Sequence, residues 1–258
     1  MSASQAMPLV DHLRELRRRL VVSAAAVALA MVPMFFLYPV IFDFLVQPFK
    51  SAVATLGSDA KLFLQGVADP FTLQIQIVTI AAVLASSPIW LFQLWGFITP
   101  GLHRNEKRWA YAFVFTATPL IAAGAALAYW AMPVGLEVLF GFTPDNVSNL
   151  IAVDRYFDFF FRMLAAFAIG FLSPMVLILL NFADVLRAST IRKWWRGILM
   201  IDLLFAAIAT PTGDPVNMMI VAAPIALLLV LAWSVAAIND RRRRKRGLLE
   251  EFDALADE

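Results

Sequence analysis

Long apolar stretches dominate the chain, and short segments rich in charged residues, proline and glycine separate them. About 20 apolar residues form a helix that crosses a hydrocarbon core of about 30 Å. Six stretches are candidates for such spans, at residues 20–42, 73–98, 109–132, 157–182, 195–209 and 218–238. The pattern therefore predicts an all-α membrane protein with six transmembrane helices.

The fifth stretch is shorter than the others. As a helix rising 1.5 Å per residue it would reach roughly 22 Å, which is too short for an undisturbed bilayer. We expect kinks at four of the prolines inside the longer stretches, because a proline removes a helix hydrogen bond. They are Pro88, Pro119, Pro174 and Pro224.

The basic residues predict the orientation of the spans. Of the 21 Lys and Arg residues, 17 fall in four clusters, at residues 14–19, 104–108, 187–196 and 241–246. Either no apolar stretch or two of them separate successive clusters, so every cluster returns to the same face. Basic loops stay on the cytoplasmic side of a membrane. We therefore expect both termini to be cytoplasmic.

The remaining segments define the outer face and the domain limits. Residues 47–71 and 133–156 are expected to be external loops, and Thr210 to Pro215 a tight external turn. The four remaining basic residues fall in or beside these loops; they are Lys50, Lys61, Arg155 and Arg162. We expect one polytopic membrane domain, residues 1–240, followed by a charged cytoplasmic tail, residues 241–258.

Composition excludes several classes of protein. With 61% hydrophobic and 16% charged residues, a soluble domain would lack the polar surface to cover itself. The only histidines are His12 and His103, the chain has no cysteine, and no metalloprotease, hydrolase or P-loop motif is present. We expect no metal site and no catalysis, and we expect the first apolar stretch to remain as a span, since it exceeds a signal peptide's apolar region.

A few charges fall inside the predicted spans, where charged groups are costly and often functional. Asp158 and Arg162 are four residues apart and are expected to neutralise each other. Asp202, in the short fifth stretch, has no partner nearby in sequence. It marks either a polar contact site or a position in a water-exposed groove.

The segment before the first span is amphipathic. Four leucines recur at helical spacing and form one apolar stripe. They are Leu9, Leu13, Leu16 and Leu20. Glu15 lies on the polar side, and its simplest role is an ion pair with Arg18 or Arg19. We expect this helix to lie in the membrane interface or to continue into the first span.

Two motifs resemble those of the TatC family, the substrate-receptor subunit of the twin-arginine protein translocase. Residues 11–20 are similar to its H-L-x-E-L-R-x-R signature. Residues 93–108 resemble its Q-x-W-x-F-x-x-P-x-L-x-x-x-E-[KR]-[KR] segment. Further matches fall in the first and last external segments. They are Pro48, Asp69, Pro70, Phe71, Thr210, Pro211 and Asp214.

The resemblance implies a concave wall of six helices that binds signal peptides carrying paired arginines, so that folded proteins cross the cytoplasmic membrane. It implies single-helix TatA and TatB subunits as partners in a hetero-oligomer. It also implies contact with membrane lipid, no nucleic acid and no cofactor, with the transmembrane proton gradient as the source of energy.

The resemblance also assigns residues. Glu15 and Glu106 match the family's two carboxylates for the arginine pair, and Phe97 matches an aromatic residue beside them. Arg17, Arg19 and His103 lie in the same matched segments and complete the expected signal-peptide site. Pro48, Phe71 and Asp214 match outer-face positions whose roles are more structural. We expect Asp202 and Thr210 to contact partner helices.

One departure from the family pattern affects the fourth predicted span. The family often has a glutamate in an F-E-x-P pattern, whereas this chain reads Phe171-Leu172-Ser173-Pro174. Asp202 is a candidate substitute for that acid. The alternative function is a small-solute secondary transporter, which would need binding groups on broken helices at the membrane midplane. An intramembrane enzyme would need a nucleophile and base that the sequence does not show.

Overall fold

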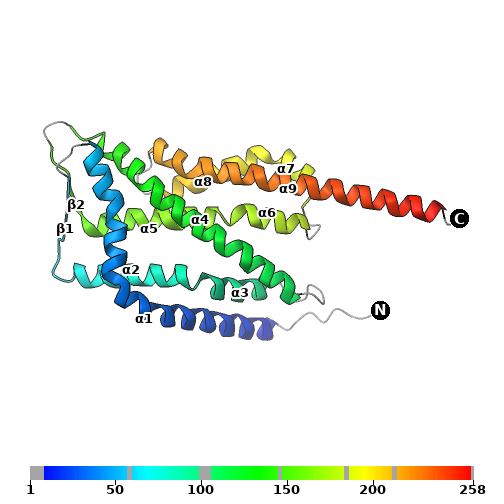
Figure 1. The fold of residues 1–258 in the computed structure, drawn as a ribbon, viewed down its shortest axis with the longest axis horizontal. Coiled ribbons are helices and arrows are strands. Elements are labelled where there is room, and N and C mark those ends of the chain that lie inside the picture. The colour runs from blue at the N-terminus through cyan, green and yellow to red at the C-terminus, as the bar shows by residue number, and fades with distance from the viewer. Residues whose placement is uncertain are drawn as a thin grey trace.

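The structure is a computed structural model, and it describes residues 9–56, 60–98, 106–144, 147–182, 186–210 and 214–256. Side chains are described for these residues except 9–12, 98, 106–110, 246 and 248–256. Within these ranges the chain forms nine helices and two short strands. The helices pack mainly along the long axis of the molecule (Figure 1).

The start of α1 (Leu9–Leu56) and the end of α9 (Pro215–Ala256) lie at one end of the molecule, together with the start of α4 (Glu106–Phe140), the end of α6 (Ser173–Phe182) and the start of α7 (Ala188–Lys193) (Figure 1). The described residues of the four basic clusters fall at this end, which we name the basic end. The two strands lie at the opposite end, which we name the strand end. The segregation of charge predicted from the sequence is therefore present in the fold, and the assignment of the basic end to the cytoplasm remains a prediction.

The first helix, α1 (Leu9–Leu56), has 48 residues, so its path is roughly 70 Å long and exceeds a single span, and it bends midway (Figure 1). The amphipathic segment continues directly into the first span. The helix also continues through Pro48, so the prediction of an external loop starting at residue 47 was wrong. Phe49 and Ala52 are buried in the core, and this packing keeps the chain helical beyond the proline.

The second predicted span is a bent pair of helices, α2 (Asp69–Ala85) and α3 (Ser87–Ile98), which meet at 62°. The break falls two residues before Pro88, as the proline pattern predicted. The carbonyl of Ala82 accepts both the hydroxyl of Ser86 at 2.7 Å and its backbone N–H at 2.9 Å, and the next carbonyl, of Val83, accepts the indole N–H of Trp90 at 2.9 Å.

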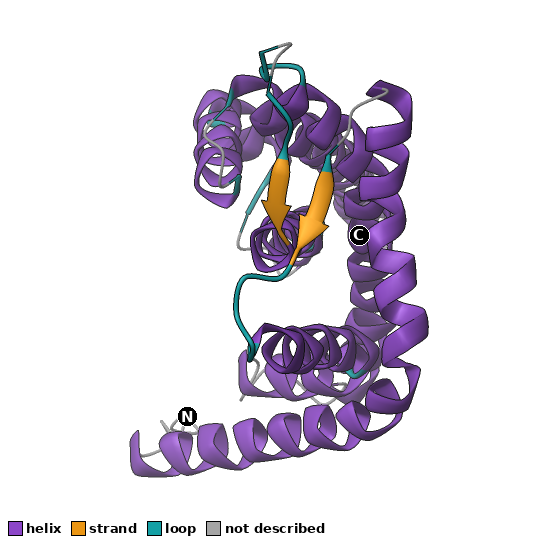
Figure 2. Cartoon of the chain, turned by 90° about the vertical axis from the view of Figure 1, so that its left-hand side faces the viewer, coloured by secondary structure: helices purple, strands orange, loops and turns teal. Residues whose placement is uncertain are grey.

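The next helix, α4 (Glu106–Phe140), is also longer than predicted. It continues through Pro133 for two more turns. The expected external loop at residues 133–156 is correspondingly shorter. It contains a strand, β2 (Leu150–Ala152), that pairs in parallel with β1 (Lys61–Phe63). Figure 2 shows the two strands side by side across the strand end. The two strands join the two segments that the sequence predicted to be external loops, and the sequence did not predict the strands themselves.

Five helices complete the described chain. They are α5 (Val153–Gly170), α6 (Ser173–Phe182), α7 (Ala188–Lys193), α8 (Trp195–Ala209) and α9 (Pro215–Ala256). Pro174 again follows a helix break, between α5 and α6. Helix α8 has the 15 residues expected for the short fifth stretch. Helix α9 continues through most of the segment predicted to be a charged tail.

The described helices identify an all-helical membrane protein. Four helical segments are long and apolar enough to cross a membrane, or five when α2 and α3 count as one bent span. Helix α8 is too short to be counted in this way. Six spans and their orientation therefore remain predictions.

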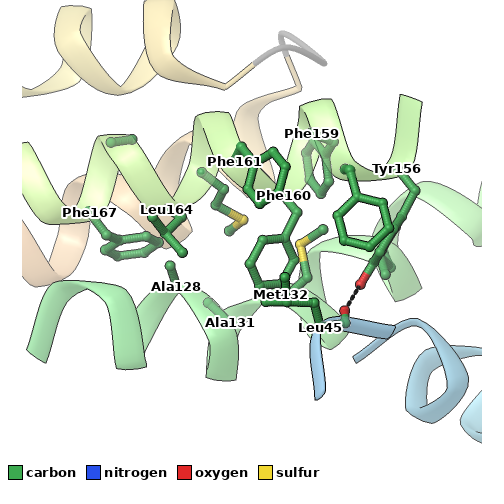
Figure 3. Close-up of a cluster of buried hydrophobic side chains, with 14 of the residues drawn as sticks. Leu45, Ala128, Ala131, Met132, Tyr156, Phe159, Phe160, Phe161, Leu164 and Phe167 are labelled. Carbon is green, nitrogen blue, oxygen red and sulfur yellow. Dashed lines mark hydrogen bonds between the residues drawn. The ribbon is translucent and has the colours of Figure 1, made fainter. Parts of the chain in front are cut away.

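The core is built around α5, whose aromatic rings face small side chains on α4. Figure 3 shows Phe160 and Phe167 beside Ala128 and Ala131. Lipid is as apolar as these side chains, so close packing rather than escape from water stabilises the contact. At Gly124 a Cβ atom would lie 2.7 Å from the carbonyl oxygen of Phe167, so only glycine permits this approach of α4 to α5.

Hydrogen bonds from tyrosines of α5 and α4 tie this core to α1. The hydroxyl of Tyr156 on α5 donates to the carbonyl of Leu45 at 2.6 Å (Figure 3). A tyrosine hydroxyl buried at membrane depth needs such an acceptor. Pro48 has no N–H, so the carbonyl of Phe44, four residues earlier, lacks its helix donor and accepts instead from the hydroxyl of Tyr129 on α4 at 3.2 Å.

Candidate binding site at the basic end

An ion pair within the first three turns of α1 confirms one of the two pairings predicted for Glu15. Arg19 donates to Glu15 Oε1 from Nε at 2.9 Å and from Nη2 at 2.5 Å. Arg18 is exposed and takes no part. The side chains of Arg19 and Glu15 are 23% and 24% exposed, so the pair lies at the edge of the packed protein.

The same guanidinium reaches across to α3. Arg19 Nη1 donates to the backbone carbonyl of Gln93 at 3.3 Å. A Cβ atom at Gly96 would lie 2.7 Å from the central carbon of the guanidinium, so any larger residue would displace Arg19. Gln93 and Gly96 therefore hold Arg19 in place, although sequence analysis assigned neither residue to the site. The signal was present, because both lie in the segment that resembles the family motif.

The second oxygen of Glu15 is in a different situation from the first. Glu15 Oε2 is buried and has no hydrogen-bond partner among the described residues. A buried carboxylate oxygen without a donor costs about 1–3 kcal/mol or more. Because Arg19 binds only Oε1, the carboxylate keeps an acceptor for a further donor that approaches the basic end.

Helix α3 also positions the start of α4. Trp95 stacks on Phe113 with ring centroids 4.5 Å apart, and Phe92 lies 5.6 Å from Tyr111. These contacts hold the first turns of α4 beside the end of α3. Glu106 is the first residue of α4, so its backbone starts at this end of the molecule.

The other expected members of the site differ in what the structure shows. Phe97 is half-buried on α3, next to Gly96. Arg17 is exposed on α1 and makes no described contact. The side chain of Glu106 and the whole of His103 lie outside the described residues. The structure thus brings Glu15, Arg19 and α3 together.

The three residues expected at the outer face lie at the strand end. Pro48 is buried within α1, whereas Phe71 is 65% exposed on the first turn of α2. Asp214 immediately precedes α9, and its Oδ1 accepts from the backbone N–H of Asn217 at 2.7 Å and its Oδ2 from the Asn217 side chain at 3.0 Å. Asn217 also donates to the carbonyl of Gly135 at 3.4 Å, so this cap connects α9 to α4.

Asp202 lies on α8, and Thr210 caps the C-terminal end of that helix. Asp202 is only 5% exposed, and its Oδ1 has no hydrogen-bond partner among the described residues. This burial contradicts the alternative of a water-exposed groove position. Thr210 is buried as well, and its hydroxyl donates to the carbonyl of Ala206 at 2.9 Å.

The predicted pairing of Asp158 with Arg162 was wrong. Asp158 Oδ1 accepts from the side-chain amide of Gln76 at 3.1 Å, which joins α5 to α2. Arg162 is exposed and forms no ion pair with Asp158. A residue on another helix supplied the partner, and sequence spacing along α5 alone does not reveal it.

Leu172 replaces the acid of the family pattern with an apolar contact. It lies at the break between α5 and α6 and packs against a cluster that includes Leu91, Phe113 and Met175. Asp202 lies on α8 and not at this break, so the structure does not support the idea that Asp202 substitutes for that acid.

A second polar cluster lies at the basic end, on α6, α7 and α9. Asn181 donates to Asp240 Oδ1 at 2.9 Å and accepts from Asn239 at 2.9 Å. Asp240 Oδ2 accepts from the backbone N–H of Ala188 at 2.8 Å. Asn181 also donates to the carbonyl of Leu186 at 2.8 Å. Both carboxylate oxygens of Asp240 are therefore occupied.

Comparison with known proteins identifies the family. Residues 11–224 match the family described as "Sec-independent protein translocase protein (TatC)". The chain is 38% identical to the TatC protein of Frankia casuarinae, over 98% of this chain and 71% of that protein. It is 37% identical to the TatC protein of Xylanimonas cellulosilytica, over 93% of this chain and 87% of that protein.

Solved structures agree with the sequence comparisons. A crystal structure described as the twin arginine translocase receptor TatC in DDM superposes with a TM-score of 0.75. It is 27% identical and covers 87% of this chain and 99% of its own. The chain is thus a multi-pass membrane protein that belongs to the TatC family, the TatC component of the Sec-independent, twin-arginine protein translocase.

Proposed function

We propose that the protein is the receptor of this translocase for twin-arginine signal peptides, and that Glu15 and Glu106 bind the two arginines. The observation that carries the proposal is the open Oε2 of Glu15, a buried acceptor at the edge of the basic end. The similar solved structure is itself described as a receptor. Membership in a translocase family also argues against the alternative of a small-solute transporter.

Recognition of arginine follows from the geometry of the carboxylate. A guanidinium presents a planar fork of donors that fits a carboxylate, whereas lysine presents a single compact charge. Arg19 already satisfies Oε1, so a guest arginine binds Oε2 or displaces Arg19. We expect modest affinity, because internal cations compete, and sharp selectivity for arginine over lysine.

The partner subunits are proposed to approach along α8. Its 15 residues span roughly 22 Å, so the bilayer must thin beside it. Asp202 offers a buried carboxylate oxygen without a donor, which a polar side chain of a partner helix would satisfy. In this proposal TatA and TatB associate at this edge, the basic end is cytoplasmic with six spans, and the proton gradient drives export.

Titration of a labelled twin-arginine peptide against the purified protein in lipid nanodiscs tests the receptor function. A charge-assisted contact contributes about 1.5–3 kcal/mol, so Glu15→Gln should weaken binding roughly 10- to 150-fold. Asp43→Asn is the matched control, because Asp43 is an exposed carboxylate on the same helix, far from the basic end. Equal affinity for arginine and lysine peptides in the wild type would contradict the proposal.

A further inference from the structure

A cavity lies among α6, α7, α8 and α9, toward the basic end. Its volume is about 600 Å³, within the range of small-molecule binding pockets. Most of its wall is apolar, with Leu177 on α6, Leu199 on α8 and Leu229 on α9. The cavity is separate from the Glu15 site, which α1 and α3 form.

Two arginines line this apolar cavity, Arg192 on α7 and Arg196 on α8. Both are exposed, and neither has a hydrogen-bond or ion-pair partner among the described residues. Two tryptophans, Trp195 and Trp233, complete the lining. Arginine and tryptophan beside an apolar wall are typical of the depth at which lipid headgroups meet acyl chains.

The walls of the cavity are fixed before any ligand binds. Trp233 Nε1 donates to the carbonyl of Ala188 at 3.2 Å, and the backbone N–H of Ala188 donates to Asp240. These two bonds attach the start of α7 to α9. Because α7 carries Arg192, its backbone position relative to the apolar wall is set by the fold.

We propose that this cavity binds an anionic phospholipid, with the phosphate between Arg192 and Arg196 and an acyl chain against the leucines. Two guanidinium groups match the geometry of a phosphate, and basic pockets between membrane helices bind anionic headgroups. A free phosphate would leave the apolar wall uncovered. A twin-arginine segment would be repelled by the two cations, so the proposal does not rest on the function of Glu15.

The nearby charges support the choice of an anion. Asp240, a described carboxylate at the basic end, already has both oxygens occupied, and Asp202, six residues beyond Arg196 on α8, is buried. Arg187, Lys193 and the basic residues 241–245 of α9 extend the positive surface. An anionic headgroup therefore meets uncompensated positive charge on each side of the cavity.

Native mass spectrometry of the purified protein, titrated with phosphatidylglycerol or with phosphatidylcholine of the same acyl chains, tests the proposal. We expect phosphatidylglycerol to bind at least tenfold more tightly than phosphatidylcholine. The double variant R192Q/R196Q should lose about tenfold or more of this affinity. The matched control is R241Q/R244Q, which removes the same charge from exposed arginines of α9 outside the cavity.

Three results would overturn the proposal. Equal losses in the two double variants would show general attraction to the basic end rather than a site. Binding of glycerol 3-phosphate as tightly as phosphatidylglycerol would show that the apolar wall makes no contribution. Displacement of phosphatidylglycerol by the twin-arginine peptide would assign the cavity to the peptide. An unchanged affinity of R192Q/R196Q for the twin-arginine peptide would show that the variant is folded and that the cavity is separate from the Glu15 site.

Discussion

The two polar clusters at the basic end join helices that are distant in sequence, but they differ in how completely their groups are bonded. Around Asp240, both carboxylate oxygens accept hydrogen bonds, and Asn181 both donates and accepts. Around Glu15, one oxygen receives two bonds from Arg19 and the other receives none. A fully bonded cluster stabilises the fold, whereas the incompletely bonded one is where we propose that a ligand binds.

Removing the Asp240 carboxylate should have the largest effect on stability. In Asp240→Ala the buried N–H of Ala188 loses its acceptor and Asn181 loses one of its bonds, at about 1–3 kcal/mol for each group. We expect a clearly lower thermal midpoint of the purified protein in detergent. Asp43→Ala, an exposed carboxylate on α1, should leave the midpoint unchanged. An unchanged midpoint in Asp240→Ala would remove the distinction between the clusters.

Glu106→Gln should have the largest effect on function. Glu106 begins α4, whose first turns pack on α3, whereas Glu15 lies near the start of α1, where helices fray. We expect export to fall by roughly 10- to 150-fold, the loss of one charge-assisted contact, while the amount of protein in the membrane stays the same. Measuring export of a reporter alongside membrane content separates function from folding. A larger loss in Glu15→Gln would reverse the proposed ranking.

Gly96→Ala tests the position of Arg19 without changing any charge. The new methyl group would collide with the guanidinium, so Arg19 must leave Gln93 and the Glu15 pair. We expect several-fold weaker peptide binding. Gly197→Ala on α8 is the control, because its Cβ would make only an ordinary contact of 3.7 Å with Trp194. Equal affinities in both variants would mean that Arg19 does not shape the site.

Asp202→Asn should have the smallest effect on the isolated protein. The change removes a buried charge and keeps the shape of the side chain, so the thermal midpoint should stay the same or rise slightly. Association with partner helices, measured by crosslinking along α8, should weaken. Crosslinks that avoid α8 and α9 in the wild type would show that partners bind elsewhere.

The length of the apolar stretches and the positions of the charges predicted which residues form helices. Tertiary packing determines where the helices end. Residues 195–209 were bounded correctly, because basic residues and a Pro/Gly turn flank the apolar run. Helix α1 passes Pro48 because Phe49 and Ala52 are buried, which no local pattern shows. The strands β1 and β2 have three residues each and exist only because two distant loops meet.

The site was predictable only in part for the same reason. The spacing of Glu15 and Arg19 identified the ion pair, because both lie on one helix face. The contacts of Arg19 with Gln93 and Gly96 depend on how α1 crosses α3, and the pairing of Asp158 with Gln76 depends on how α5 lies beside α2. Motif resemblance located the segment on α3 but not the role of its glycine.

A double-mutant cycle between Glu15 and the peptide tests the central claim most directly. Calorimetric titration would compare wild type and Glu15→Gln, each with a twin-arginine peptide and with peptides in which either arginine is replaced by glutamine. The account predicts that replacing one of the two peptide arginines weakens binding to the wild type but not to Glu15→Gln, with a coupling energy of about 1 kcal/mol or more. If each arginine replacement in the peptide weakens binding by the same factor in Glu15→Gln as in the wild type, Glu15 is only a counterion of Arg19.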